Sequence, residues 1–184
     1  MKARDFDPAK LDVEAFAKAG ARLEGVWPLE QLERLRSSTV AGSGSHLHDV
    51  AWSALGELRP VRGGAAEIWL HVEASAQVML ECQRCLAPVA TAVGAKRSFL
   101  FVHGENTAAD LDAESEDDVL ALTRALDLVE LIEDELLLEL PLVPRHETCP
   151  SPLPAGDATA QAAEDDAPHP FAALAALKRG GLPN

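Results

Sequence analysis

The chain has 184 residues, a formal net charge of −14 at pH 7 and a hydrophobic content of 47%. This length suits one folded domain with tails, and the acidity argues against a protein that wraps nucleic acid by bulk electrostatics. The longest apolar runs are too short to span a bilayer, and the N-terminal segment has no signal-peptide core. Three cysteines do not make a disulfide framework, so we expect a soluble cytoplasmic protein with no membrane partner.

The N-terminal part of the chain predicts two short helices around a strand. Asp7 and Pro8 suit the start of a helix over residues 9–19. Residues 21–27 alternate weakly, as a strand does. Residues 29–36 place leucines on one helical face and charged side chains on the other, which predicts a second helix.

After a serine- and glycine-rich connection, the hydrophobic period changes to two. Residues 50–56 alternate, and a proline with a glycine pair marks a turn after them. Four short apolar segments follow, and we expect each to be a separate strand: residues 67–72, 76–81, 89–93 and 98–103. Short strands joined by short turns are typical of an antiparallel sheet or an open barrel.

The acidic part of the chain predicts a loop, a short strand and the main helix. Residues 105–135 contain twelve acidic residues and one arginine. We interpret residues 104–118 as an acidic, alanine-rich loop and residues 119–122 as a short strand. Apolar residues at steps of three and four predict an amphipathic helix over 127–140, stopped by Pro141. We expect its acidic side chains to form a solvated face: Glu130, Glu133, Asp134 and Glu135.

The predicted fold class is therefore α+β, with flanking helices and one main amphipathic helix after the sheet. We expect a single domain over residues 1–150. Residues 151–169 are rich in Pro, Ala, Asp and Glu and predict a disordered acidic linker. Residues 170–184 predict a short apolar helix and a tail, and a helix of that length needs a surface to dock on.

Two cysteine-containing patches carry the strongest chemical signal. Cys82 and Cys85 form the only CxxC of the sequence, and His146 and Cys149 repeat the same two-residue gap. A tetrahedral zinc ion needs about four such ligands, so these residues are a candidate structural zinc site. Two alternatives stay open: a thiol–disulfide pair, and a packed hairpin turn with two small buried side chains.

A mildly basic stretch surrounds the CxxC. Its cations are candidates for a small phosphate-facing patch that binds RNA: Arg59, Arg62, Arg84, Lys96 and Arg97. No series of aromatic residues for base stacking accompanies them, so scattered solubilising charges are an equally good interpretation. No phosphate-binding or nucleophile motif is present, and nothing in the sequence suggests a catalytic set.

Residues 78–89, Val-Met-Leu-Glu-Cys-Gln-Arg-Cys-Leu-Ala-Pro-Val, resemble the signature of the YceD family, the large ribosomal RNA subunit accumulation proteins of bacteria and plastids. Three further features agree in order along the chain. Residues 127–144 resemble an acidic, leucine-rich helix closing in Leu-Pro-x-x-Pro. His146 and Cys149 stand where the family places a His or Cys cluster, and residues 170–178 are similar to its Pro-Phe-x-x-Leu-x-x-Leu-Lys.

The resemblance implies a non-enzymatic ribosome-biogenesis factor that supports accumulation of large-subunit ribosomal RNA. Its partners would be that RNA, an early assembly intermediate or ribosomal proteins. The acidic segment over residues 105–118 would bind a basic ribosomal protein, while the positive CxxC face, with Arg84 at its tip, meets RNA. The alternative functions are a thiol–disulfide enzyme and a zinc module that binds a protein.

Overall fold

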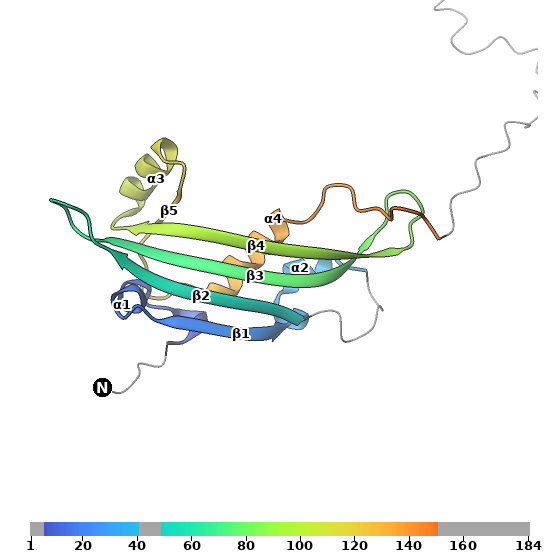
Figure 1. Ribbon diagram of the computed structural model, residues 1–184, viewed down its shortest axis with the longest axis horizontal. Helices are drawn as coiled ribbons and strands as arrows, with labels where there is room; N and C mark the ends of the chain where they lie inside the picture. The colour runs from blue at the N-terminus through green and yellow to red at the C-terminus, as the bar shows by residue number, and fades with distance from the viewer. Residues whose placement is uncertain (1–5, 41–48, 151–184) are drawn as a thin grey trace, which may run out of the picture. The chain divides into compact units, whose positions relative to one another are not determined.

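A computed structural model describes residues 6–40 and 49–150 of the chain. Its centre is a five-stranded sheet with the strand order β1-β2-β3-β4-β5 (Figure 1). Four strands form an antiparallel meander: β1 (Arg22–Pro28), β2 (Asp49–Arg59), β3 (Glu67–Glu81) and β4 (Pro88–Val102). The short β5 (Asp118–Ala121) pairs parallel to β4 at the edge. The predicted α+β class with an open, mainly antiparallel sheet is confirmed.

The helices α1 (Val13–Lys18) and α4 (Leu128–Leu138) pack on one face of the sheet, with α2 (Glu33–Ser37) against α4. Figure 1 shows α4 crossing behind the strands. Alternate residues of the central strands point to these helices and are buried, among them Val50, Leu70 and Phe99. The opposite, outer face carries the polar residues of the same strands, as a half-buried antiparallel sheet requires.

Close packing between α1 and β2 depends on Gly56. A Cβ atom built there would lie 2.7 Å from Cδ1 of Phe16 and 2.8 Å from Cα of Ala17. Any larger residue would push α1 away from the sheet, because interiors have no spare volume at this spacing. The glycine therefore sets the depth at which the first helix is buried.

The hairpin of β3 and β4 is longer than the sequence predicted. Each strand has 15 residues, and the pairing runs from Ile68 with Phe101 to Glu81 with Pro88. The four predicted short strands are thus two long ones. Polar outer residues interrupted the apolar runs, but the alternation continues through residues 73–75, where Ala74 is buried. The turn between β3 and β4 therefore lies a full strand length from the end of the hairpin at which Ile68 pairs with Phe101.

The first predicted helix is broken into two pieces. Residue Leu11 leaves the helical path between η1 (Pro8–Lys10) and α1 and exchanges backbone hydrogen bonds of 2.8 and 3.0 Å with Leu126. Asp7 caps η1, and Asp12 caps α1 by accepting from the amide of Ala15 at 3.0 Å. The predicted helix over 29–36 is likewise split at Leu32, into η2 (Leu29–Gln31) and α2.

The predicted acidic loop over residues 104–118 is wrong, because most of it is the helix α3 (Glu105–Glu114). A parallel strand pair needs a crossover connection, and α3 supplies it between β4 and β5. Gly104, with a φ of 89°, turns the chain out of β4. Only Ala108 of this helix is buried, so the helix has little apolar periodicity from which it could be predicted.

The acidic residues of α4 do not all form a solvated face, which corrects the prediction. Glu133 and Glu135 are buried, with 7% and 8% exposure. The Glu133 carboxylate accepts from the backbone amides of Arg34 at 2.8 Å and Leu35 at 3.1 Å. It therefore caps α2, whose own preceding residue, Leu32, has no side-chain acceptor.

The chain divides into two units, Met1–Cys149 and Pro150–Asn184. The predicted linker over 151–169 and the predicted helix and tail over 170–184 lie outside the described residues and stay predictions. Within residues 6–40 and 49–150, no helix is long and apolar enough to cross a membrane.

Candidate metal centre

The turn that joins β3 to β4 holds the CxxC. Cys82 is fully buried and Cys85 half-buried. The amide of Cys82 donates to the carbonyl of Ala87 at 3.0 Å, and the amide of Leu86 donates back to the carbonyl of Cys82 at 2.8 Å. Leu86 has a φ of 60°, a left-handed conformation that closes the turn. Both sulfur atoms are thereby held at the tip of a rigid hairpin.

The segment after α4 brings the second pair of candidate ligands to this tip. Pro141 follows the end of α4 and prevents its continuation. The carbonyl of Pro144 then accepts a hydrogen bond of 2.9 Å from the amide of Gln83. Figure 1 shows this segment running from α4 to the hairpin turn. The two patches predicted to meet are therefore adjacent in the fold.

The four predicted metal-ligating residues are brought together. One donor atom from each lies within 4.8 Å of the other three: Cys82, Cys85, His146 and Cys149. Ligand atoms of a tetrahedral zinc site are about 3.8 Å apart, as metal–sulfur bonds of about 2.3 Å dictate. A small contraction thus brings this set to coordination distance. Three thiols and one imidazole are donors that suit zinc.

The histidine is already oriented as a ligand. Its Nε2–H group donates to the carbonyl of Pro88 at 3.1 Å, so Nδ1 keeps its lone pair. Nδ1 of His146 lies 3.5 Å from Sγ of Cys85. Metal-binding histidines commonly have such an outer hydrogen bond, which fixes the tautomer and the ring plane.

The electrostatics of the cluster also suit a cation. Burial by itself would raise the pKa of Cys82, but hydrogen bonds from the backbone amides of Arg84, His146 and Cys85 outweigh it and lower the pKa to about 5. Burial and the neighbouring sulfur atoms of Cys85 and Cys82 raise the pKa of Cys149 to about 11. A bound cation would offset the repulsion among the negatively charged sulfur atoms, so the cluster favours binding of a positive metal ion.

The geometry favours metal binding over thiol–disulfide exchange. Reactive CxxC pairs lie where a strand meets the N-terminus of a helix, whereas this pair lies between two strands. Two further donors, His146 and Cys149, close around the pair. The arrangement therefore resembles a closed structural site more than an accessible thiol pair.

The five predicted RNA-binding cations are not gathered on one surface. Arg59 pairs with Glu67 at one end of β3, and Arg84 lies beyond the other end, about 45 Å away for a strand of this length. Arg97 points to the helix-covered face and bonds Glu135 at 3.0 Å. Arg62 lies in the turn between β2 and β3. RNA binding by each residue stays a prediction, but a single patch does not form.

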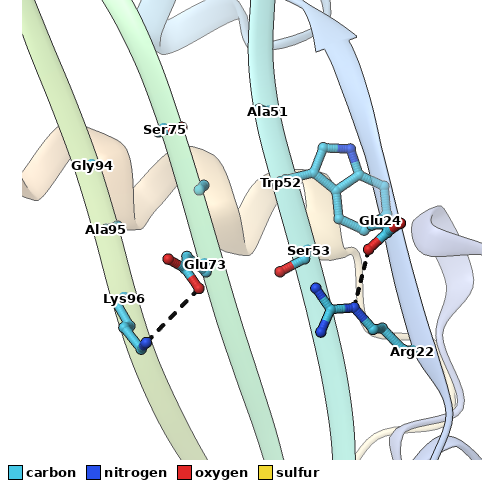
Figure 2. Close-up of a pocket in the computed structure, with 11 residues that line it drawn as sticks. Arg22, Glu24, Ala51, Trp52, Ser53, Glu73, Ser75, Gly94, Ala95 and Lys96 are labelled. Carbon is cyan, nitrogen blue, oxygen red and sulfur yellow. Dashed lines mark hydrogen bonds and ion pairs between the residues drawn. The ribbon is translucent and has the colours of Figure 1, made fainter.

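Lys96 lies on the outer face of the sheet, beside a shallow hollow of about 530 Å³ (Figure 2). Its ammonium group is 3.9 Å from Glu73, and on the opposite rim Arg22 bonds Glu24 at 3.1 Å. The floor consists of small residues such as Ser53. Because each cation has a carboxylate partner, the hollow offers no net positive charge to a phosphate.

Three contributors to the centre were not predicted from the sequence. The carbonyl of Pro88 orients the imidazole, the amide of Gln83 holds the incoming segment, and Leu86 closes the turn. Backbone groups leave no residue-specific signal. Leu86 has a positive φ, a backbone conformation that glycine adopts most easily, so its leucine side chain gave no sign that the turn closes at this position.

The sequence of the chain matches a known protein family. The family model described as "Large ribosomal RNA subunit accumulation protein YceD" matches residues 70–178, which is more than half of the chain. The chain belongs to the YceD family. A YceD relative of the same description from Haemophilus influenzae is 29% identical over 174 residues, covering 92% of this chain and 95% of the relative. No solved structure matched the chain.

The match to the YceD family contains both halves of the candidate metal centre. It begins in β3, before Cys82, and continues past Cys149. The expected resemblance is therefore confirmed, and the region it covers includes the hairpin, α4 and the segment that joins them.

Proposed function

We propose that this chain supports the accumulation of large-subunit ribosomal RNA, by binding that RNA or an early large-subunit assembly intermediate. The observation that carries the proposal is the YceD match over residues 70–178. The relative from Haemophilus influenzae, which covers nearly the whole chain, bears the same description. The proposed role is that of a non-enzymatic factor acting in the cytoplasm.

We further propose that zinc is the resident ion of the Cys82, Cys85, His146 and Cys149 centre. Its role is structural, because four protein donors leave no position for a reacting molecule. The ion would fasten the segment after α4 to the β3–β4 turn. A fixed turn is what a recognition surface at this end of the sheet requires.

The charge distribution supports separate contacts for RNA and protein. Residues 105–118, in and after α3, contain seven carboxylates and no lysine or arginine. Arg84 and Arg145 lie exposed at the metal centre. The acidic segment would meet a basic ribosomal protein, and the arginines would meet phosphate.

Affinity purification of the tagged full-length chain tests this function. Cell extract is passed over the tagged protein at low salt, and bound RNA and proteins are identified. We expect large-subunit ribosomal RNA, or large-subunit proteins, to be enriched over small-subunit components. Absence of both at low salt would contradict the proposal. A depletion strain should also show a lowered ratio of large- to small-subunit ribosomal RNA.

A further inference from the structure

An apolar side chain is displayed at the tip of the β3–β4 hairpin at an energetic cost. Leu86 is 63% exposed and has a φ of 60°. Among the described residues it is the only non-glycine with a positive φ. A left-handed backbone is less favourable for a leucine than for a glycine, and the exposed side chain regains little by burial. A position that suits glycine thus holds a leucine without benefit to the fold.

The backbone around Leu86 is fixed. Its own amide donates to the carbonyl of Cys82, and the amide of Cys82 donates to the carbonyl of Ala87. The side chain therefore projects from a closed turn in one backbone conformation. A contact made by such a side chain loses little conformational freedom on binding.

Two arginines from separate segments accompany this leucine. Gln83 bonds Pro144, and Cys85 contacts His146, so Arg84 and Arg145 occupy matching positions between these contacts. Both are exposed. Residues 82–88 and 144–146 contain these two arginines and no carboxylate, although Glu81 and Glu147 flank them. The tip is thus locally positive in a chain of net charge −14.

The segment leading to the tip adds further apolar surface. Leu142 is 99% exposed and Val143 is 55% exposed, immediately before Pro144. Single exposed aliphatic residues are ordinary, but these two stand directly before Pro144, which accepts a hydrogen bond from Gln83 in the turn that carries Leu86. The combination of apolar and cationic groups on a narrow tip matches a nucleotide, which has an apolar base face and a negative phosphate.

We propose that the metal-centre tip binds unpaired nucleotides of RNA, with Leu86 against a base face and Arg84 and Arg145 on the adjoining phosphates. The proposal rests on the RNA-binding role proposed above and specifies the form of RNA. In an A-form duplex the base faces are stacked on one another and closed to side chains, whereas loops and bulges expose them. A duplex would satisfy the two arginines but leave Leu86 without a contact.

Binding measurements on the full-length, metal-containing protein test this. The probes are RNAs of about 16 nucleotides that tile large-subunit ribosomal RNA, each offered as a single strand and annealed to its complement. The variant is Leu86→Gly, and the matched control is Val61→Gly, which removes an exposed aliphatic residue from the turn at the opposite end of β3. We expect single strands to bind more tightly than duplexes. Leu86→Gly should weaken single-strand binding about fivefold or more.

Leu86→Gly should also unfold at the same temperature as the wild type or higher, because glycine relieves the left-handed strain. Lower affinity with undiminished stability cannot arise from misfolding. If single strands and duplexes bind equally, or if Leu86→Gly binds as the wild type does, the inference is wrong while the RNA role stands. If neither form of RNA binds, the RNA role itself fails, and the inference with it.

Discussion

The Nε2 atom of His146 lies 3.1 Å from the carbonyl oxygen of Pro88. This one bond connects the segment after α4 to the first residue of β4 and, at the same time, turns Nδ1 toward the sulfur of Cys85. A neutral imidazole with its proton on Nε2 is ready to bind a metal through Nδ1. The bond to Pro88 therefore fixes the tautomer and the direction of the imidazole within the candidate centre.

Metal affinity should increase with pH. Since the pKa of Cys149 is raised to about 11, its thiol is protonated at neutral pH and must lose that proton to bind a cation. Cys82, with a pKa lowered to about 5, is already a thiolate above that pH. We expect the logarithm of the zinc association constant to rise by about one or more per pH unit between pH 6 and pH 8. Competition with a chromophoric chelator measures it, and a pH-independent constant would contradict it.

Glu133 should be important for stability although it lies on the polar side of an amphipathic pattern. Its carboxylate caps α2 and bonds the guanidinium of Arg34 at 2.8 Å. Glu133→Ala leaves two amides without their acceptor, so we expect a loss of about 2–4 kcal/mol in the free energy of unfolding. The exposed Glu130, three residues earlier in α4, is the control, and Glu130→Ala should change stability by less than about 0.5 kcal/mol. Equal effects of both changes in urea titrations would contradict the assigned cap.

Gly56 should not tolerate a side chain. Alanine would place its Cβ within 2.7–2.8 Å of Phe16 and Ala17, including the backbone of α1, which cannot move aside alone. We expect Gly56→Ala to destabilise the protein by about 1–3 kcal/mol. Gly64→Ala, where the nearest atom is 3.6 Å away in Val61, is the control. A thermal midpoint for Gly56→Ala at or above that of Gly64→Ala would show that α1 packs differently.

Of the predicted RNA-binding cations, Arg84 should affect RNA binding and Arg97 should affect stability. Arg84 is exposed at the turn, so Arg84→Glu should weaken RNA association and leave the thermal midpoint nearly unchanged. Arg97 bonds the buried Glu135, so Arg97→Ala should cost about 2 kcal/mol of stability.

The loss in Arg97→Ala should also depend on pH. Burial raises the pKa of Glu135, and the arginine counteracts this effect. Without Arg97 the folded state favours the protonated acid still more, so the variant recovers stability as the pH falls. A loss that is the same at acidic and neutral pH, or unchanged RNA affinity in Arg84→Glu, would contradict these assignments.

Much of the fold could be predicted because its signals are local. The period of two identified the sheet residues, and the three-and-four spacing with Asp127 identified α4. The helix breaks at Leu11 and Leu32 depend on residues distant in sequence. Leu11 bonds the backbone of Leu126, and Glu133 caps the helix α2 that begins after Leu32. Helix α3 serves as the crossover that the parallel pairing of β4 and β5 requires. No residue within 105–114 carries a sequence signal for that pairing.

The candidate metal ligands could be predicted from matching two-residue gaps, since CxxC and HxxC each place two donors on one side of a turn. The way in which the halves meet depends on backbone groups of Gln83, Pro88 and Pro144, which carry no sequence pattern. The five predicted cations do not form one patch, because the position of a residue along a strand decides both the face and the end of the sheet on which it lies. Arg97 and Lys96 are neighbours in sequence yet point to opposite faces.

Metal content of the purified chain tests the central claim most directly. Elemental analysis should find about one zinc ion per chain, as a closed four-donor site predicts. Cys82→Ser and Cys149→Ser should lose it, whereas Gln83→Ala, which changes the same turn without removing a donor, should keep it. A wild-type chain without metal, in which all three thiols titrate under reducing conditions, would contradict the metal centre and leave a packed hairpin turn.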